Sequence, residues 1–421
     1  MARLSASILL IALLSVAAFS QSATNSLKPG KANVQSASQI AFGPEGILFV
    51  GDSRQAAVFA IATEDTKAPA GPVNINVEAV NEKIAALLGI PADQLLINDM
   101  EVNPLSRNIY VAVSRGRGPD ALPVILKVDG ASKISEFRLD NVRHAMAALV
   151  DAPEAKPDAD VRGPEGQVNA NPRVRTIHDM SYLDGKVLVA GLSNQDFASD
   201  MRSIPFPFTK VDKGTGIRMW HAAHGRYETA SPVRSFIPYT VGREQFVLAS
   251  YGCTPVVKIP VKELTSGGKV HGTTIVELGN GSTPLDMLSY QKGGKNYILI
   301  ATTSRGVMKF SADEVGTAKK LGPPTNACEQ STEQSTPRPG GMPGCTIDVG
   351  GIAYQTIETL KGVWQMAKLD ESKAVVLSDR TPWAPNAREA GKVAPPVVPG
   401  NATWFTLNPN TAIDLKTVAL P

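Results

Sequence analysis

The chain has 421 residues, of which 42 are Lys or Arg and 39 are Asp or Glu, and its formal net charge is +3. This near-neutral balance gives no reason to expect nucleic acid or an anionic membrane as a partner. Such a length usually means two or three domains, unless one repeat architecture accounts for all of it.

The first 20 residues have the pattern of a secretory signal peptide. Arg3 supplies a positive charge, residues 8–18 are apolar, and Ala18, Phe19 and Ser20 offer small residues at a cleavage site. An uncleaved anchor is the alternative, although the apolar run is short for a bilayer. We therefore expect residues 1–20 to be removed and the mature chain, with no transmembrane segment, to be secreted or periplasmic.

From about residue 38 onward, one pattern occurs six times. Each copy has a short apolar strand, a turn, a second apolar strand ending in small polar residues, and a third apolar strand. Val, Ile and aromatic residues dominate, with Gly, Pro, Asn and Asp between them, which favours strands over helices. One such sheet cannot bury its own faces, whereas six arranged radially bury each other. We predict an all-β fold, a single six-bladed β-propeller over residues 21–421, with blades starting near residues 38, 98, 178, 235, 285 and 350.

The first copy carries the clearest form of the repeat, Ile-Ala-Phe-Gly-Pro-Glu-Gly-Ile-Leu-Phe-Val-Gly-Asp-Ser over residues 40–53. This segment resembles the repeat of the NHL-type and gluconolactonase/paraoxonase-like six-bladed propellers. The other five copies resemble it loosely. The resemblance implies the architecture and says little about activity.

The connectors and third strands complete the expected organisation. Apolar residues at helical spacing predict short helices over residues 81–91 and 141–150, both on one face, and residues 151–175 read as a surface loop. The third strands are expected at residues 58–61, 123–128, 202–206, 255–259, 306–310 and 403–407.

The three cysteines are expected to differ in role. An exported chain meets an oxidising compartment, so Cys328 and Cys345, which bracket a loop rich in Pro, Gly, Ser and Thr, are expected to form a disulfide. Cys253 is left over, either as a small buried residue or as a reactive thiol.

Three aspartates are expected to meet at the mouth of the central channel, because the inner strands of a propeller start at one face. The aligned positions before the inner-strand Met or Ile are Gln39, Asp99, Asp179, Phe236, Asp286 and Gly351. Three converging carboxylates repel each other unless a cation lies between them. A divalent cation such as Ca²⁺ is therefore predicted on Asp99, Asp179 and Asp286, with Asn98 beside them.

Two considerations limit the calcium hypothesis. Lactonase-like propellers carry such a metal on Glu, Asn and Asp, and this sequence departs from that set at Gln39, Phe236 and Gly351. Alternatively, each aspartate caps its own blade by accepting hydrogen bonds from backbone N–H groups.

Loops that return to the same face carry arginines in four copies. These are Arg54, Arg115, Arg305 and Arg380, with Asn194 and Tyr251 at the position in the other two copies. Guanidinium groups around one mouth would bind carboxylate, sulfate or phosphate. Ion pairs with the three aspartates, or plain solvation, are the alternatives.

Histidines offer two further hypotheses. His178 beside Asp179 could act as a general base, or as an ordinary hydrogen-bonded residue at a strand start. His221 and His224 could hold a soft or borderline metal, or belong to an outer strand and its turn.

Two functions remain after these considerations. We favour a binding or scaffold protein, expected as a monomer, whose mouth holds a small anionic molecule or a protein partner. The alternative is a metal-dependent hydrolase resembling the lactonases and esterases, with a cation on the aspartates and His178 as base. The chain has no Gly-x-Ser-x-Gly, haem-attaching or phosphate-loop motif, which disfavours α/β-hydrolases, c-type cytochromes and nucleotide-dependent enzymes.

Overall fold

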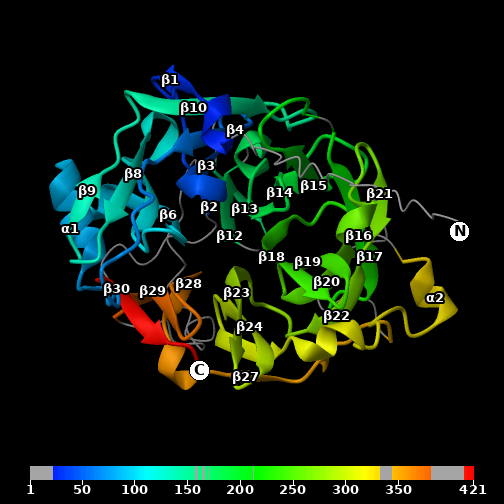
Figure 1. The fold of residues 1–421 in the computed structure, drawn as a ribbon. Helices are drawn as coiled ribbons and strands as arrows, with labels where there is room; N and C mark the ends of the chain where they lie inside the picture. The colour runs from blue at the N-terminus through cyan, green and yellow to red at the C-terminus, as the bar shows by residue number, and fades with distance from the viewer. Residues whose placement is uncertain are drawn as a thin grey trace, which may run out of the picture.

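Six antiparallel sheets stand around a central axis, with the innermost strand of each beside that axis (Figure 1). This computed structural model describes residues 22–156, 160–163, 166–169, 171–211, 213–331, 344–380 and 412–421. The predicted six-bladed β-propeller is confirmed. In the described part the only α-helices are α1 (Val80–Leu88) and α2 (Asn326–Glu329), and neither is long and apolar enough to cross a membrane. The expected signal segment, residues 1–20, lies outside the described residues.

The first three blades have the following strands, from the innermost outward. Blade one consists of β2 (Gln39–Phe42), β3 (Ile47–Asp52), β4 (Ala57–Ala62), β10 (Val142–Ala148) and β1 (Lys28–Gly30). Blade two consists of β6 (Leu95–Val102), β7 (Ile109–Arg115), β8 (Leu122–Val128) and β9 (Ile134–Glu136). Blade three consists of β13 (Asp179–Leu183), β14 (Lys186–Leu192), β15 (Ser199–Pro205), β16 (Thr215–His221) and β17 (Arg226–Glu228), and β21 (Lys269–His271) pairs with β16 in parallel.

The other three blades follow the same scheme. Blade four consists of β18 (Val233–Val241), β19 (Glu244–Tyr251), β20 (Pro255–Pro260), β22 (Thr273–Glu277) and β26 (Gly350–Gly351). Blade five consists of β23 (Pro284–Lys292), β24 (Lys295–Thr302), β25 (Gly306–Ser311) and β27 (Tyr354–Thr356). Blade six consists of β28 (Val363–Lys368), β29 (Lys373–Asp379), β30 (Ile413–Ala419) and β5 (Asn76–Val77).

Short elements connect the blades. A separate hairpin, β11 (Asp160–Gly163) and β12 (Gly166–Asn169), lies in the segment 151–175, where the sequence predicts loop throughout. The 3-10 turns are η1 (Ala23–Ser26), η2 (Pro44–Gly46), η3 (Ala92–Gln94), η4 (Gly118–Asp120), η5 (Pro172–Arg175), η6 (Val261–Glu263), η7 (Asp313–Gly316) and η8 (Glu358–Leu360).

The blades do not follow one another around the ring in chain order. The innermost strand β6 of blade two contacts β2 of blade one and β28 of blade six, while β2 also contacts β13 of blade three. The order around the axis is therefore two, one, three, four, five and six, as Figure 1 shows. Two strands that are distant in sequence from the rest of their sheets make this possible. Strand β10 joins blade one after the chain has completed blade two, and β5 joins blade six before blade two begins.

The hydrophobic core lies between neighbouring blades. One cluster brings together Val111 of blade two and Leu377 of blade six, and another brings together Phe49 of blade one and Val189 of blade three. Because both faces of each sheet are covered in this way, second strands such as β3 are buried at every residue. This explains why such strands are continuous apolar runs in the sequence.

One predicted helix is a strand. Residues 141–150 contain β10, in which His144 pairs with Ile61 of β4 on one side and with Lys28 of β1 on the other. The edge of β4 offers unpaired N–H and C=O groups, and pairing with them outweighs a weak helical pattern.

The other predicted helix, over residues 81–91, is confirmed as α1. Its residues Ile84 and Leu88 are buried in the cluster between blades two and six. It ends at Gly89, whose φ of 66° lies in the left-handed region that favours glycine.

Blade six starts later than predicted. Gly351 belongs to β26, which pairs with β22 of blade four, and Tyr354 belongs to β27, which pairs with β25 of blade five. The inner strand of blade six is β28, and its third strand is β30. The third strand predicted at residues 403–407 lies outside the described residues, whereas the other five predicted third strands are confirmed.

Candidate functional site

The candidate sites lie on the face where the inner strands begin, which we call the mouth face. The turns between second and third strands reach the same face, because neighbouring strands in each blade are antiparallel. The hairpin formed by β16 and β17 extends beyond the end of β15 on this face, since Gly216 is paired with Asp200 and the strand continues to His221. Side chains from inner strands and outer turns can therefore meet there.

One polar residue per blade forms a ring around the axis, which we call the polar ring. In four blades a bulge precedes it, at Asn98, Arg234, Leu285 and Trp364. The pairing register then makes these ring residues equivalent: Gln39, Asp99, Asp179, Ser235, Asp286 and Gln365. The predicted positions in blades four and six, Phe236 and Gly351, are thus replaced by Ser235 and Gln365. Around the ring, acidic and neutral residues alternate.

Each aspartate of the polar ring joins two blades through backbone hydrogen bonds. The carboxylate of Asp179 accepts the N–H of Met180 in its own strand at 2.7 Å and that of Phe236 in blade four at 2.7 Å. The same two bonds are made by Asp99 with Met100 and Ile40, and by Asp286 with Met287 and Met366. The three aspartates therefore bridge blades two and one, three and four, and five and six.

The pKa values of these carboxyl groups are raised. Burial raises the pKa of Asp99 to about 8, with the charge of Asp179 adding to it and the Ile40 N–H opposing it. Burial raises the pKa of Asp179 to about 7. The pKa values of Asp286 and of Glu101, which follows Met100 in β6, lie well above their usual range, mainly through burial, with repulsion by ring aspartates adding to it. These groups consequently hold protons near neutral pH unless a cation neutralises them.

The structure brings the predicted calcium ligands together without grouping them tightly. In the described part of the chain, one group of three His, Cys, Asp or Glu side chains has its ligand atoms within 4.8 Å of one another, and it does not include the ring aspartates. Asn98 is buried and its amide donates to Ala37 O at 2.8 Å and to Ser114 Oγ at 2.9 Å. One hydrogen bond of each aspartate matches the capping alternative, while the other goes to a neighbouring blade, and calcium binding stays a prediction.

Three of the four predicted arginines bond to other loops and not to the ring aspartates. The guanidinium of Arg54 donates to the carbonyl groups of Gly118 and Pro119, and that of Arg305 donates to Asn280 O. Arg380 pairs with Asp414 at 2.8 Å and with Glu78 at 2.9 Å. Arg115 and Asn194 are exposed. Three of the arginines named from the sequence thus hold loops in place.

His178 occupies a different electrostatic setting. It is 5% exposed, and among the described residues its Nε2 has no hydrogen-bond partner. Burial, together with the positive charges of Arg234 and Arg175, lowers its pKa well below the usual value, so the ring is neutral at neutral pH. Arg234 is the bulge residue of β18 and Arg175 ends η5. The sequence analysis missed both arginines, because neither lies at a position that recurs in the repeat. The extra residue at the bulge before an inner strand is the signal that could have indicated Arg234.

The tight group of ligand atoms consists of His221, His224 and Cys253. The two histidines lie on the turn between β16 and β17, and Cys253 lies on the turn between β19 and β20 of blade four. Glu228 of β17 binds both imidazoles, with Oε2 at 2.8 Å from His221 Nδ1 and Oε1 at 2.6 Å from His224 Nδ1. The sequence spacing indicated the histidine pair, whereas Cys253 and Glu228 join it only in the folded chain.

The side chains of this group shift one another's pKa values. Burial lowers the pKa of His224, but hydrogen bonds to Cys253 and Glu228 outweigh it and give a pKa of about 10. Burial outweighs Glu228 at His221 and lowers its pKa. Burial alone would raise the pKa of Glu228, yet the two histidines hold it well below its usual range.

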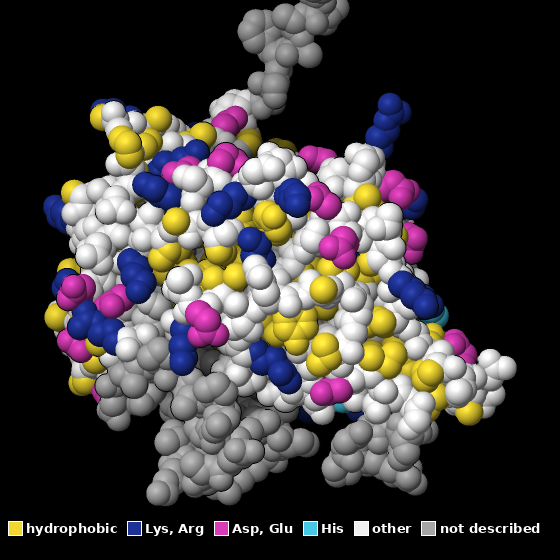
Figure 2. Space-filling model, turned by 90° about the horizontal axis from the view of Figure 1, so that it is seen from below, with side chains coloured by type: hydrophobic (Ala, Val, Ile, Leu, Met, Phe, Trp, Pro, Cys, Tyr) yellow, Lys and Arg dark blue, Asp and Glu magenta, His cyan; other side chains and the backbone are white. Residues whose placement is uncertain are grey.

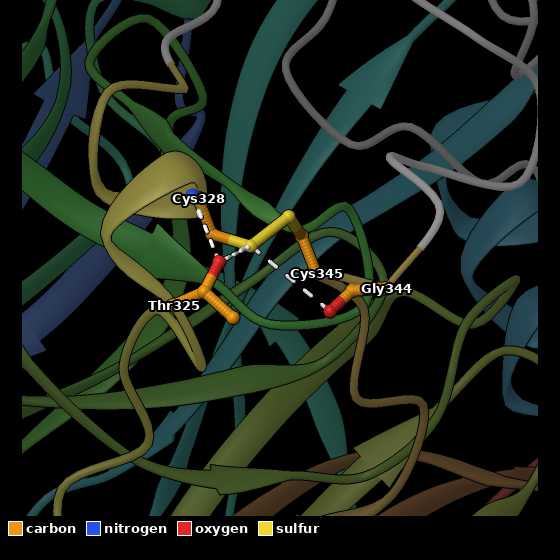
Figure 3. The surroundings of a disulfide bond; sticks show 4 residues. All are labelled: Thr325, Cys328, Gly344 and Cys345. Atoms are coloured by element: carbon orange, nitrogen blue, oxygen red, sulfur yellow. Dashed lines mark hydrogen bonds between the residues drawn. A yellow bond between two sulfur atoms is a disulfide. The ribbon is translucent and has the colours of Figure 1, made fainter.

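The predicted disulfide between Cys328 and Cys345 is confirmed and lies against this hairpin (Figure 3). Both cysteines are buried with Trp220 and Tyr227 of the hairpin. Gly225, with φ of 63°, packs so closely on Cys345 that an added Cβ would lie 2.9 Å from it. The disulfide thus holds the segment around residue 345 against the turn that carries the histidines.

Comparisons with known proteins concern the fold. No family model and no curated protein matches the chain. Among solved structures, a chain of the mitotic checkpoint complex has a TM-score of 0.35 at 8% identity, covering 100% of this chain and 99% of that one. A PQQ-bound aldose sugar dehydrogenase from Streptomyces coelicolor has a TM-score of 0.31 at 11% identity over 93% of this chain and 98% of its own. A streptogramin B lyase has a TM-score of 0.31 at 7% identity over 94% of this chain and 97% of its own.

Proposed function

We propose that this chain is an exported β-propeller that binds a small anionic molecule on the mouth face, where blades three and four meet. The observation that carries the proposal is the position of His178, a buried imidazole next to the positive charges of Arg234 and Arg175. Both guanidinium groups act on the imidazole as positive charges, so an anion bound beside His178 would be attracted to both of them. Each guanidinium offers a planar fork of donors that suits a carboxylate, sulfate or phosphate group.

Two features support export. Residues 1–20 have the composition of a signal peptide. The disulfide between Cys328 and Cys345 suits an oxidising compartment. Among the described residues on the face seen in Figure 2, Lys and Arg are interspersed with Asp and Glu and form no continuous basic patch of the kind that binds a nucleic acid.

Binding is favoured over hydrolysis because of the aspartates. A calcium-dependent hydrolase resembling the lactonases would need carboxylate oxygens directed at the cation. In Asp99, Asp179 and Asp286 both oxygens already accept backbone N–H groups. The resemblance to NHL-type and lactonase-like propellers therefore supports the architecture alone, and we propose the mouth face as the place of the ligand site.

Anion titration of the purified mature protein tests the proposal. Sulfate, phosphate and citrate are added separately, and binding is measured by calorimetry and by the rise in Tm. We expect Arg234→Met and Arg175→Met each to weaken binding about tenfold or more, because one charged hydrogen-bonding group contributes roughly 1.5–3 kcal/mol. Arg115→Met, which removes an exposed arginine on the same face, is the matched control and should bind as the wild type does. Equal binding by all four proteins would contradict the proposal.

A further inference from the structure

We infer that His221, His224 and Cys253 form a binding site for a borderline transition-metal ion, Zn²⁺ in the first instance, between blade three and blade four. Their ligand atoms all lie within 4.8 Å of one another. Two imidazole nitrogens and one sulfur suit zinc or copper and do not suit the oxygen-seeking Ca²⁺ or Mg²⁺. The site uses none of the residues of the proposed anion site, so either proposal can fail without the other.

The two histidines are already oriented as metal ligands. Glu228 takes the Nδ1 atoms of both rings, at 2.8 Å for His221 and 2.6 Å for His224. The rings stack with centroids 3.7 Å apart, so the two imidazoles lie side by side. A carboxylate that holds Nδ1–H fixes the tautomer whose Nε2 lone pair can bind a metal.

His221 supplies an independent sign of a missing ligand. Its side chain is 1% exposed, and its Nε2 is buried without a hydrogen-bond partner among the described residues. A buried polar nitrogen without a partner costs about 1–3 kcal/mol, which a metal bond at that atom would remove. A purely structural hydrogen-bond network would leave this nitrogen unexplained.

Cys253 is presented to the histidines by a constrained turn. Cys253 and Thr254 have φ values of 60° and 64°, in the left-handed region that side chains other than glycine rarely adopt. Thr254 is fully buried, and its hydroxyl donates to Gly279 O at 2.9 Å. Residues held in such conformations gather at functional sites, where the surrounding structure supports the strain. Cys253 is also the cysteine left outside the disulfide.

A second carboxylate lies on the side of blade four. Glu277 ends β22, is fully buried, and accepts the Ala223 N–H at 3.2 Å through Oε2. Its Oε1 has no hydrogen-bond partner within the described part of the chain. The charge of Glu277 acts on both Cys253 and His224, which places it beside the ligand set. A divalent ion on the two histidines and the thiolate would give this Oε1 a partner, directly or through a bound water.

Metal titration of the full mature chain, treated with a chelator and then dialysed, tests the inference. Zn²⁺ is measured against a chromophoric chelator, and Co²⁺ serves as a spectroscopic probe of the ligand set. We expect one ion per chain, a near-ultraviolet thiolate-to-cobalt band and the intense visible bands of tetrahedral cobalt. Cys253→Ser should abolish the thiolate band and weaken Zn²⁺ binding at least tenfold, and His221→Asn should weaken it by a similar factor.

Two further variants separate a ligand site from a general effect on folding. Glu228→Gln should weaken Zn²⁺ binding by about 10–100-fold, as expected for a residue that orients metal-bound histidines. His271→Asn changes an exposed histidine of the same blade and should bind metal as the wild type does. Circular dichroism and Tm show which variants are folded. If His221→Asn fails to fold, the milder Cys253→Ser decides.

Three outcomes can be distinguished. A thiolate-to-copper band with Cu²⁺, at tighter binding than Zn²⁺, would support the site and assign copper as its ion. Alkylation of Cys253 by iodoacetamide at the same rate with and without Zn²⁺ would overturn the inference and favour a metal-free thiolate–imidazolium pair. Undiminished Zn²⁺ binding by Cys253→Ser would overturn it as well.

Discussion

Replacing Asp179 by Asn should change how the stability of the propeller depends on pH. The raised pKa, about 7 compared with the ordinary 3.8, means that the folded chain keeps a proton that the unfolded chain releases. The stabilisation from this group is therefore fully present below about pH 4 and is lost as the pH rises through 7. In the wild type, the free energy of unfolding should fall across this interval.

The magnitude follows from the pKa difference. Between 3.8 and about 7 the full value is about 4 kcal/mol, at roughly 1.4 kcal/mol per pKa unit. Asp179 is only half-buried, and the charge of a partly exposed group is screened by solvent, so we expect about 2 kcal/mol. An asparagine side chain at this position would accept only one of the two N–H groups, which lowers stability by about 1–3 kcal/mol at pH 5. Between pH 5 and pH 8 this deficit should shrink by about 1 kcal/mol, because over this interval the wild type alone loses the remaining part of the contribution of the protonated carboxyl group.

Guanidinium unfolding at pH 5, 6, 7 and 8, with chelator present, measures these differences. Asp196→Asn, which alters an exposed carboxylate of the same blade paired with Lys269, should give a curve parallel to that of the wild type. A constant difference between wild type and Asp179→Asn from pH 5 to 8 would refute the reasoning. Repeating the series with Ca²⁺ examines the calcium prediction, because a cation on the ring would raise wild-type stability at pH 8 and leave Asp179→Asn unchanged.

Two further predictions concern blade three and the disulfide that lies against it. Replacing Cys328 and Cys345 by Ala should lower the free energy of unfolding by about 3 kcal/mol, because a disulfide with a sequence separation of 17 lowers the entropy of the unfolded chain. Denaturant unfolding measures this loss, and a value below about 1 kcal/mol would contradict the prediction. Arg202→Met should lower the free energy of unfolding by about 3–5 kcal/mol, because it leaves Asp200 as an unpaired buried charge. The Asp200 side chain is 0% exposed and lies 3.1 Å from the Arg202 guanidinium. The double variant with Asp200→Asn should recover much of this loss, and no recovery would contradict the prediction.

The fold was predictable where its cause is local. Apolar runs such as Ile47–Asp52 and the turn residues between them indicate strands, and six copies indicate a propeller. The order of the blades depends on β5 and β10, whose partners lie far away in the sequence. The same long-range pairing turned the predicted helix over residues 141–150 into a strand. Blade six was misplaced because residues 351–354 resemble an inner strand but extend two neighbouring sheets.

The candidate sites were likewise predictable only where they follow from the local repeat. The convergence of Asp99, Asp179 and Asp286 follows from the repeat, whereas their hydrogen bonds to neighbouring blades depend on the ring order. A one-residue bulge shifted the ring position in blade four from Phe236 to Ser235. The sequence pattern does not show that Cys253 lies beside His221 and His224, because a blade boundary separates them. Arg175 and Arg234 have no counterpart in the other copies of the repeat, and their charges act together on His178 only in the fold.

A crystal structure of the mature chain soaked with selenate tests the central claim most directly. Selenate has the shape and charge of sulfate, and selenium is located by its anomalous scattering. Our account predicts a selenium peak at which the selenate oxygens lie within hydrogen-bonding distance of the Arg175 and Arg234 guanidinium groups and of His178. Selenate bound only at other places, or absent while these three side chains keep their positions, would contradict it.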